Sequence, residues 1–170
     1  MNQKRLFGLA ILMVFMGCAA LQPLAVREEK YGKAAPVIQQ AFASKTMRNG
    51  DTWKVYLKAS DADGDMKGFV SYLEKGGRAG DQSATYTRIK EDNRKELSGF
   101  LYWYPGSNLG YSSEVVMTIQ IQDMAGHLSN PVSLPLYMHP SGKQEPPPNE
   151  VFQENNLGPI MIPVKPIGSG

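Results

Sequence analysis

The sequence predicts an all-β domain: a single sandwich of seven antiparallel strands. Three segments alternate between apolar and polar side chains, at residues 52–60, 115–122 and 130–138. A period of two is typical of antiparallel strands that bury one face. Turns rich in glycine, aspartate and asparagine separate the segments, and no part of the domain shows a convincing helical period. Short strands divided by such turns favour a sandwich.

Each alternating segment defines one apolar face, which is expected to point into the core. These faces are Trp53, Val55, Leu57 and Ala59; Val115, Met117, Ile119 and Ile121; and Val132, Leu134, Leu136 and Met138. Less regular strands are expected at residues 37–46, 67–74, 84–90 and 96–104. Pro135 lies on a polar face and has no N–H, which predicts an edge strand. The polar segment 91–96 is expected to be a turn.

Two turns resemble those of a known fold family. Residues 121–132, IQDMAGHLSNPV, resemble the closing hairpin of bacterial immunoglobulin-like and fibronectin type III-like domains. There a strand ends in Asp-x-x-Gly-Asn; Asp123 and Gly126 match, and His127 takes the place of the Asn. Residues 60–66 similarly resemble the Asp-x-Asp-Gly-Asp turn after the second strand. The resemblance covers residues 36–138 and implies an immunoglobulin-like β-sandwich, which specifies a fold rather than an activity.

The first 17 residues predict a secretory signal peptide. Lys4 and Arg5 precede an apolar run of about eleven residues, too short for a membrane-spanning helix of ~20. Residues 14–18, VFMGC, then resemble the lipobox of bacterial lipoproteins. That resemblance implies cleavage before Cys18 and lipidation of Cys18; the alternative is ordinary cleavage after Ala20.

The lipobox also implies a location in the cell envelope. A lipobox cysteine carries a diacylglyceryl group and an amide-linked acyl chain, and stable anchoring requires more than one chain. Ala19, rather than Asp, follows Cys18, which implies the outer membrane in a double-membraned bacterium. We therefore expect a small lipoprotein of the cell envelope, attached to the membrane through Cys18, with residues 18–35 as a lipidated tether.

Composition narrows the classes of partner. The 18 basic and 16 acidic residues of the chain become 16 and 16 once Lys4 and Arg5 are removed with the signal. The neutral balance and the lack of a basic stripe argue against nucleic acid as a partner. Cys18 is the only cysteine, so no disulfide within the chain is expected and the fold depends on its apolar core.

The turn at residues 60–68, SDADGDMKG, is a candidate calcium loop. In an immunoglobulin-like sandwich it lies at the same end as the turns at 123–127 and 90–96, so Glu91 and Asp92 are expected nearby. Calcium binds six to eight oxygens, and four aspartates supply carboxylates: Asp61, Asp63, Asp65 and Asp123. The EF-hand pattern fails, however, because Met66 replaces the required Gly. The alternative is a plain polar turn, with its carboxylates neutralised by Arg88, Lys90, Arg94 and Lys95.

A second candidate site is an aromatic face. If Leu97, Gly99, Leu101 and Trp103 form the core face of their strand, the intervening aromatic residues point outward. With Tyr56 from the second strand, the candidate binding face is Tyr56, Phe100, Tyr102 and Tyr104. Such a patch can bind a sugar, a partner strand or the protein's own tail. The alternative is that aromatic residues simply favour strands.

The segment 139–170 is expected to be a proline-rich extended tail, since it holds seven of the twelve prolines. Its apolar end, residues 157–167, either docks on the sandwich or binds another protein.

No catalytic motif accompanies His127 or His139, so we expect no enzyme and no required cofactor. The favoured function is a non-catalytic binding or adaptor module with an envelope partner. The alternatives are a structural spacer or accessory subunit and a carbohydrate-binding module.

Overall fold

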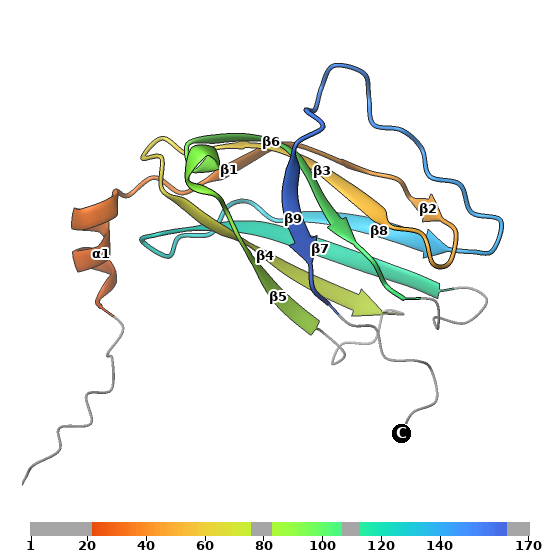
Figure 1. Cartoon of the computed structure of the whole chain (residues 1–170). Helices are drawn as coiled ribbons and strands as arrows, with labels where there is room; N and C mark the ends of the chain where they lie inside the picture. Colours follow the sequence, from red (N-terminus) through yellow and green to blue (C-terminus); the bar gives the residue numbers. More distant parts are fainter. Residues whose placement is uncertain (1–21, 76–82, 107–112, 163–170) are drawn as a thin grey trace, which may run out of the picture.

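The computed structural model of the protein describes residues 22–75, 83–106 and 113–162. Over these residues the chain forms two packed β-sheets, with a short helix at one end (Figure 1). The elements are α1 (Leu24–Tyr31), β1 (Val37–Ala43), β2 (Thr46–Met47), β3 (Trp53–Ser60), β4 (Met66–Lys75), β5 (Ser83–Arg88), the 3-10 turn η1 (Glu91–Asn93), β6 (Glu96–Trp103), β7 (Ser113–Asp123), β8 (Val132–Met138) and β9 (Asn156–Ile160).

The two sheets have the strand orders β1-β3-β6-β9 and β2-β8-β7-β4-β5. Neighbouring strands are antiparallel except at two places: β9 is parallel to β6, and β2 is parallel to β8. The all-β prediction is confirmed, and the seven predicted strands correspond to β1 and β3 to β8. The predicted number of strands is wrong, because the described residues contain nine.

The two additional strands carry no periodic signal in the sequence. β2 has only two residues, and it is held beside β8 by its pairing with Tyr137 and Met138. β9 contains Gly158 and Pro159, residue types that are depleted in strands. It is stabilised by tertiary contacts instead: Leu157 and Ile160 are buried.

The core lies between the sheets and contains the apolar faces that the alternation predicts. The four inward residues of β3 and the four of β7 are all buried. The edge-to-face pair Trp53 and Trp103, with ring centroids 6.2 Å apart, is fully buried at one end of the β3–β6 ladder. Leu136 and Met138 of β8 are fully buried, while Val132 and Leu134 pack against the core from its margin.

As Pro135 predicts, β8 is an edge strand over part of its length. Pro135 is paired on one side with Val116 of β7. On its other side β8 is paired with β2 only at Tyr137 and Met138. The missing N–H of Pro135 therefore costs no ladder hydrogen bond.

Helix α1 lies in the segment 18–35, which is predicted to be a lipidated tether without secondary structure. Residues 25–30, AVREEK, are mostly good helix formers, Pro23 precedes the helix, and Gly32 ends it with φ +108°. α1 has no buried residue. In Figure 1 it lies at the end of the sandwich where the β3–β4 and β7–β8 connections are found.

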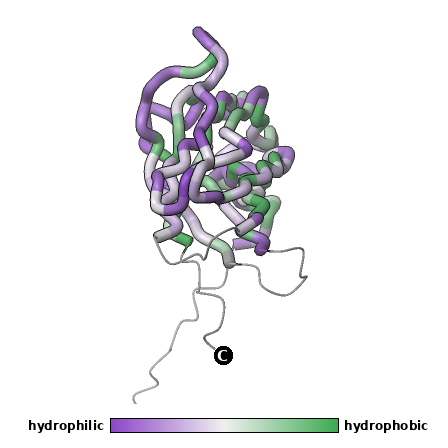
Figure 2. The backbone as a smooth tube through the Cα atoms, turned by 90° about the vertical axis from the view of Figure 1, so that its right-hand side faces the viewer, coloured by the Kyte–Doolittle hydropathy of each residue, from purple (hydrophilic) through white to green (hydrophobic). Residues whose placement is uncertain are grey.

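The connection between β8 and β9 crosses from the second sheet to the first. Figure 2 shows it as a mostly hydrophilic stretch that stands off the body. Gln144 fixes it to Thr52 through a side-chain hydrogen bond to the carbonyl oxygen, and the Glu145 N–H donates to Ser44 Oγ. The segment beyond it joins the sandwich, so the fold continues past residue 138, where the sequence placed its end.

Candidate functional site

Three connections meet at the end of the sandwich that carries α1. They are the β3–β4 connection (61–65), the β5–β6 connection (89–95) and the β7–β8 connection (124–131). Backbone hydrogen bonds join them: Asp61 N–H donates to Lys95 O, and Met124 N–H donates to Asp65 O. The predicted gathering of these turns at one end is confirmed, and we call this end the loop end.

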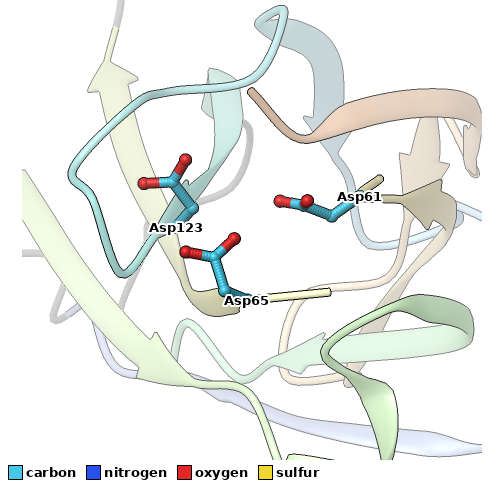
Figure 3. Close-up of side chains that lie close together, drawn as sticks. All are labelled: Asp61, Asp65 and Asp123. Carbon is cyan, nitrogen blue, oxygen red and sulfur yellow. The ribbon is translucent and has the colours of Figure 1, made fainter. Parts of the chain in front are cut away.

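Three aspartates come together at the loop end. Asp61, Asp65 and Asp123 each offer a carboxylate oxygen, and these oxygens lie within 4.8 Å of one another. Figure 3 shows the side chains side by side, with the Asp61 carboxylate pointing toward the other two. Asp61 is 3% exposed and Asp123 is 1% exposed. We call these three residues the aspartate triplet.

The hydrogen bonds leave part of the triplet unsatisfied. Asp61 Oδ1 accepts the N–H groups of Asp63 and Gly64, whereas Asp61 Oδ2 is buried without a hydrogen-bond partner. Asp65 Oδ2 accepts the N–H of Met124, whereas Asp65 Oδ1 is buried without a partner. Buried polar atoms normally have a partner, so each of these oxygens requires an explanation.

Asp123 is fully bonded and belongs to a second set of contacts. Its Oδ1 accepts the N–H groups of Gly126 and His127, and its Oδ2 lies 2.7 Å from His127 Nδ1. The other ring nitrogen of His127, Nε2, lies 3.1 Å from Glu28 Oε1 of α1. Since carboxylate oxygens only accept hydrogen bonds, an imidazole that bonds two carboxylates must be protonated on both nitrogens.

The pKa values follow from this crowding of carboxylates. Burial, followed by the charges of Asp123 and Asp61, raises the pKa of Asp65 to about 6. Burial is also the main cause that raises the pKa of Asp61. The hydrogen bond to Asp123, and then the one to Glu28, raises the pKa of His127.

The donor set suits a hard divalent cation. Within the described residues, no Lys or Arg forms an ion pair with the triplet; its one basic partner there is His127, which pairs with Asp123. Carboxylate oxygens are the ligands that calcium and magnesium prefer, whereas zinc favours Cys and His. The neighbouring His127 is unsuited as a ligand because both of its nitrogens face carboxylates.

Two of the acidic residues expected at this site are positioned otherwise. Asp63 is exposed, and its Oδ2 accepts the N–H of Ala34 at 2.8 Å, so it does not join the triplet. Glu91 forms an exposed ion pair with Arg94. Sequence reasoning found three of the residues that matter but missed Glu28, because nothing in a presumed tether indicated a contact 99 residues away.

The predicted aromatic face is divided by the chain's own tail. Tyr56 is not an exposed binding residue: it is 4% exposed, its ring packs against Phe152, and its hydroxyl donates to Glu154 Oε1 at 2.7 Å. Phe100 packs against Tyr56. The expectation of a free surface fails here because Phe152 and Glu154 of the tail pack on Tyr56.

Tyr102 and Tyr104 remain accessible beside β9. Tyr104 is 58% exposed. Together with tail residues the two tyrosines line an open groove of about 440 Å³, formed by Tyr102, Tyr104, Pro159, Ile160, Met161 and Ile162.

The predicted lipidation site, Cys18, lies outside the described residues. Among the residues that the structure does describe, no helix has the length and apolar character needed to cross a membrane.

Comparison with known proteins found no family model that matches the chain and no significant match among curated proteins.

Proposed function

We propose that the protein is a lipid-anchored envelope module of immunoglobulin-like fold that binds calcium at its loop end and has no catalytic role. The placement of β1, β3 and β6 opposite β8, β7, β4 and β5 supports the immunoglobulin-like assignment, with β2 and β9 as additions. The lipobox resemblance at Cys18 supports the anchor.

The observation that carries the calcium proposal is the pair of unpartnered oxygens, Asp61 Oδ2 and Asp65 Oδ1. A buried polar group without a partner costs about 1–3 kcal/mol, and more when it is charged. Both oxygens belong to a cluster of three carboxylates, of which only Asp123 is paired with a cationic side chain, His127. A divalent cation between the carboxylates removes the repulsion and satisfies both oxygens at once.

Calcium fits this site better than other biological cations. It accepts six to eight oxygen ligands in variable geometry, so carboxylates and the carbonyls and waters of surrounding loops can complete its shell. Magnesium requires near-ideal octahedral geometry and dehydrates reluctantly. The flexible ligand requirements of calcium match a site formed by two separate loops.

The test is calorimetric titration and thermal unfolding of the purified chain with calcium and with magnesium. We expect the melting temperature to rise with calcium, since ligand at 100 times its Kd stabilises the folded state by about 2.7 kcal/mol. Asp65→Asn should abolish the response and should itself raise the melting temperature of the cation-free protein, because it removes one of three repelling carboxylates.

Asp63→Asn is the matched control. It lies in the same turn and loses the same charge, but its side chain is outside the triplet, so calcium binding should persist. If millimolar calcium produces neither heat nor a change in melting temperature, the proposal is wrong, and the triplet is held by shared protons instead.

A further inference from the structure

The contacts recorded between residues 24–34 and the rest of the domain are polar. The helix has eight residues and none of them is buried. Isolated helices shorter than ~12–15 residues are marginal in water. Whatever keeps α1 in place must therefore be found at the loop end against which it lies.

Two loops provide those contacts. On the β7–β8 connection, His127 bonds Glu28 of α1, and Gly126 lies against the Arg27 guanidinium, which occupies the space that a side chain would need there. On the β3–β4 connection, Asp63 accepts the Ala34 N–H just beyond the helix, and the same carboxylate fills the space beside Gly32. Residues 27–34 thus contact both loops at once.

The same two loops hold the aspartate triplet. Asp61 and Asp65 flank the β3–β4 turn, and Asp123 is the last residue of β7, directly before the other loop. Repulsion between the carboxylates opposes the close approach of the two loops, which the hydrogen bond from Met124 N–H to Asp65 O maintains. A bound cation would remove that repulsion and so stabilise the spacing at which residues 27–34 reach both loops.

We infer that cation binding at Asp61, Asp65 and Asp123 locks α1 onto the domain, and that removal of the cation releases it. This inference rests on the proposed calcium site and assigns it a role: the cation sets how firmly the domain is held to its N-terminal tether. Once released, residues 22–36 can extend over about 50 Å, at ~3.3 Å per residue.

Linkage makes the coupling reciprocal. If calcium strengthens the docking of α1, docked α1 must strengthen calcium binding by the same factor. Coupling of this kind typically changes affinity by about 5–150-fold. Glu28→Gln, which weakens docking without altering any carboxylate of the triplet, is therefore expected to lower calcium affinity by about fivefold.

The test combines calorimetry with limited trypsin digestion of the full chain, with calcium or with chelator. Arg27, Lys30 and Lys33 lie within and just after α1, and cleavage there, identified by mass spectrometry, requires the segment to leave the domain. Glu29→Gln is the matched control because Glu29 is exposed and adjacent. We expect calcium to slow this cleavage at least fivefold in the wild-type protein and in Glu29→Gln, and far less in Glu28→Gln.

The outcomes separate the two proposals. Calcium that binds with measurable heat but leaves cleavage at Arg27, Lys30 and Lys33 unchanged overturns the locking role and leaves the calcium site standing. Equal calcium affinity in Glu28→Gln and Glu29→Gln overturns it as well. A protein that binds no calcium overturns both.

Discussion

Asp61 and Asp63 stand two residues apart in one turn and have different roles. Asp61 is 3% exposed and turns its carboxylate toward Asp65 and Asp123, whereas Asp63 is exposed and accepts a hydrogen bond from Ala34. The strict alternation of a strand does not apply here, because the chain reverses at Gly64 with φ +74°. The sequence thus identified the carboxylates of this end but not which of them share a site.

Glu154 is the residue whose ionisation holds the tail over Tyr56. The Glu154 carboxylate accepts hydrogen bonds from the Tyr56 hydroxyl and from Lys54 Nζ. These two bonds, that of Tyr56 more than that of Lys54, lower the pKa of Glu154 from its ordinary value of 4.5. A carboxyl group with a lowered pKa in the folded state stabilises that state above its ordinary pKa, and loses this contribution as the pH falls through the folded-state value.

We therefore expect acid to loosen the tail. At pH 7 the amides of residues 156–160 should exchange with solvent more slowly in the wild-type protein than in Glu154→Gln. As the pH is lowered below 4.5, the difference between the two proteins, compared at each pH, should shrink. Glu150→Gln, at an exposed position of the same connection, should match the wild type throughout. A difference that does not shrink in acid would contradict the role given to Glu154.

At the scale of elements, β6 and the segment that leads into β9 pack closely because Gly99 of β6 has no side chain. The backbone N–H of Phe100 donates to Asn155 O at 2.8 Å, next to Gly99. A Cβ at Gly99 would lie 2.3 Å from that carbonyl oxygen and 3.0 Å from Leu157 Cγ. Further along, the Trp103 indole N–H donates to Ile162 O.

Gly99→Ala is expected to displace the tail strand. Overpacking of this kind typically destabilises a protein by about 1–3 kcal/mol. Thermal unfolding measures the loss, and the emission of Trp103 should shift as its indole becomes hydrated. Glu96→Ala, exposed on the same strand, provides the control. An unchanged melting temperature with unchanged emission would show that β9 contributes little to the fold.

Helix α1 shows the limit of reasoning from local pattern. Its residues are compatible with a helix, but a short polar segment of eight residues is not expected to be stable alone. The stabilising partners are in the loops of the sandwich, and the nearest of them in sequence, Asp63, is 29 residues from Ala34. The residue pattern of 24–31 therefore gives no indication that the segment contacts those loops.

At the scale of the whole molecule, segments from both sides of the predicted domain fold back onto it. Residues 24–34 lie on the loop end, and residues 152–162 complete the first sheet and cover Tyr56. The predicted tether and tail are thus partly structural. This arrangement leaves Tyr102 and Tyr104 as the accessible remainder of the aromatic face.

The proposed lipid anchor is tested by the intact mass of the chain extracted from membranes. We expect a protein that lacks residues 1–17 and carries a diacylglyceryl group and an acyl chain on Cys18. Cys18→Ala should prevent the modification and leave the protein without its anchor, extractable in plain buffer. A wild-type mass that corresponds to unmodified protein cleaved after Ala20 would contradict the anchor.

The sequence by itself determined the class of the fold, the inward faces of the main strands and the identity of the carboxylates at the loop end. Those features follow from period-two alternation and from turn chemistry, which act between residues close in the chain. Only the tertiary structure decided that Asp61, Asp65 and Asp123 form a cluster, that α1 docks through Glu28, and that β9 fills the space beside Gly99. Each of these depends on contacts between segments tens of residues apart, and such contacts leave no mark on the local pattern.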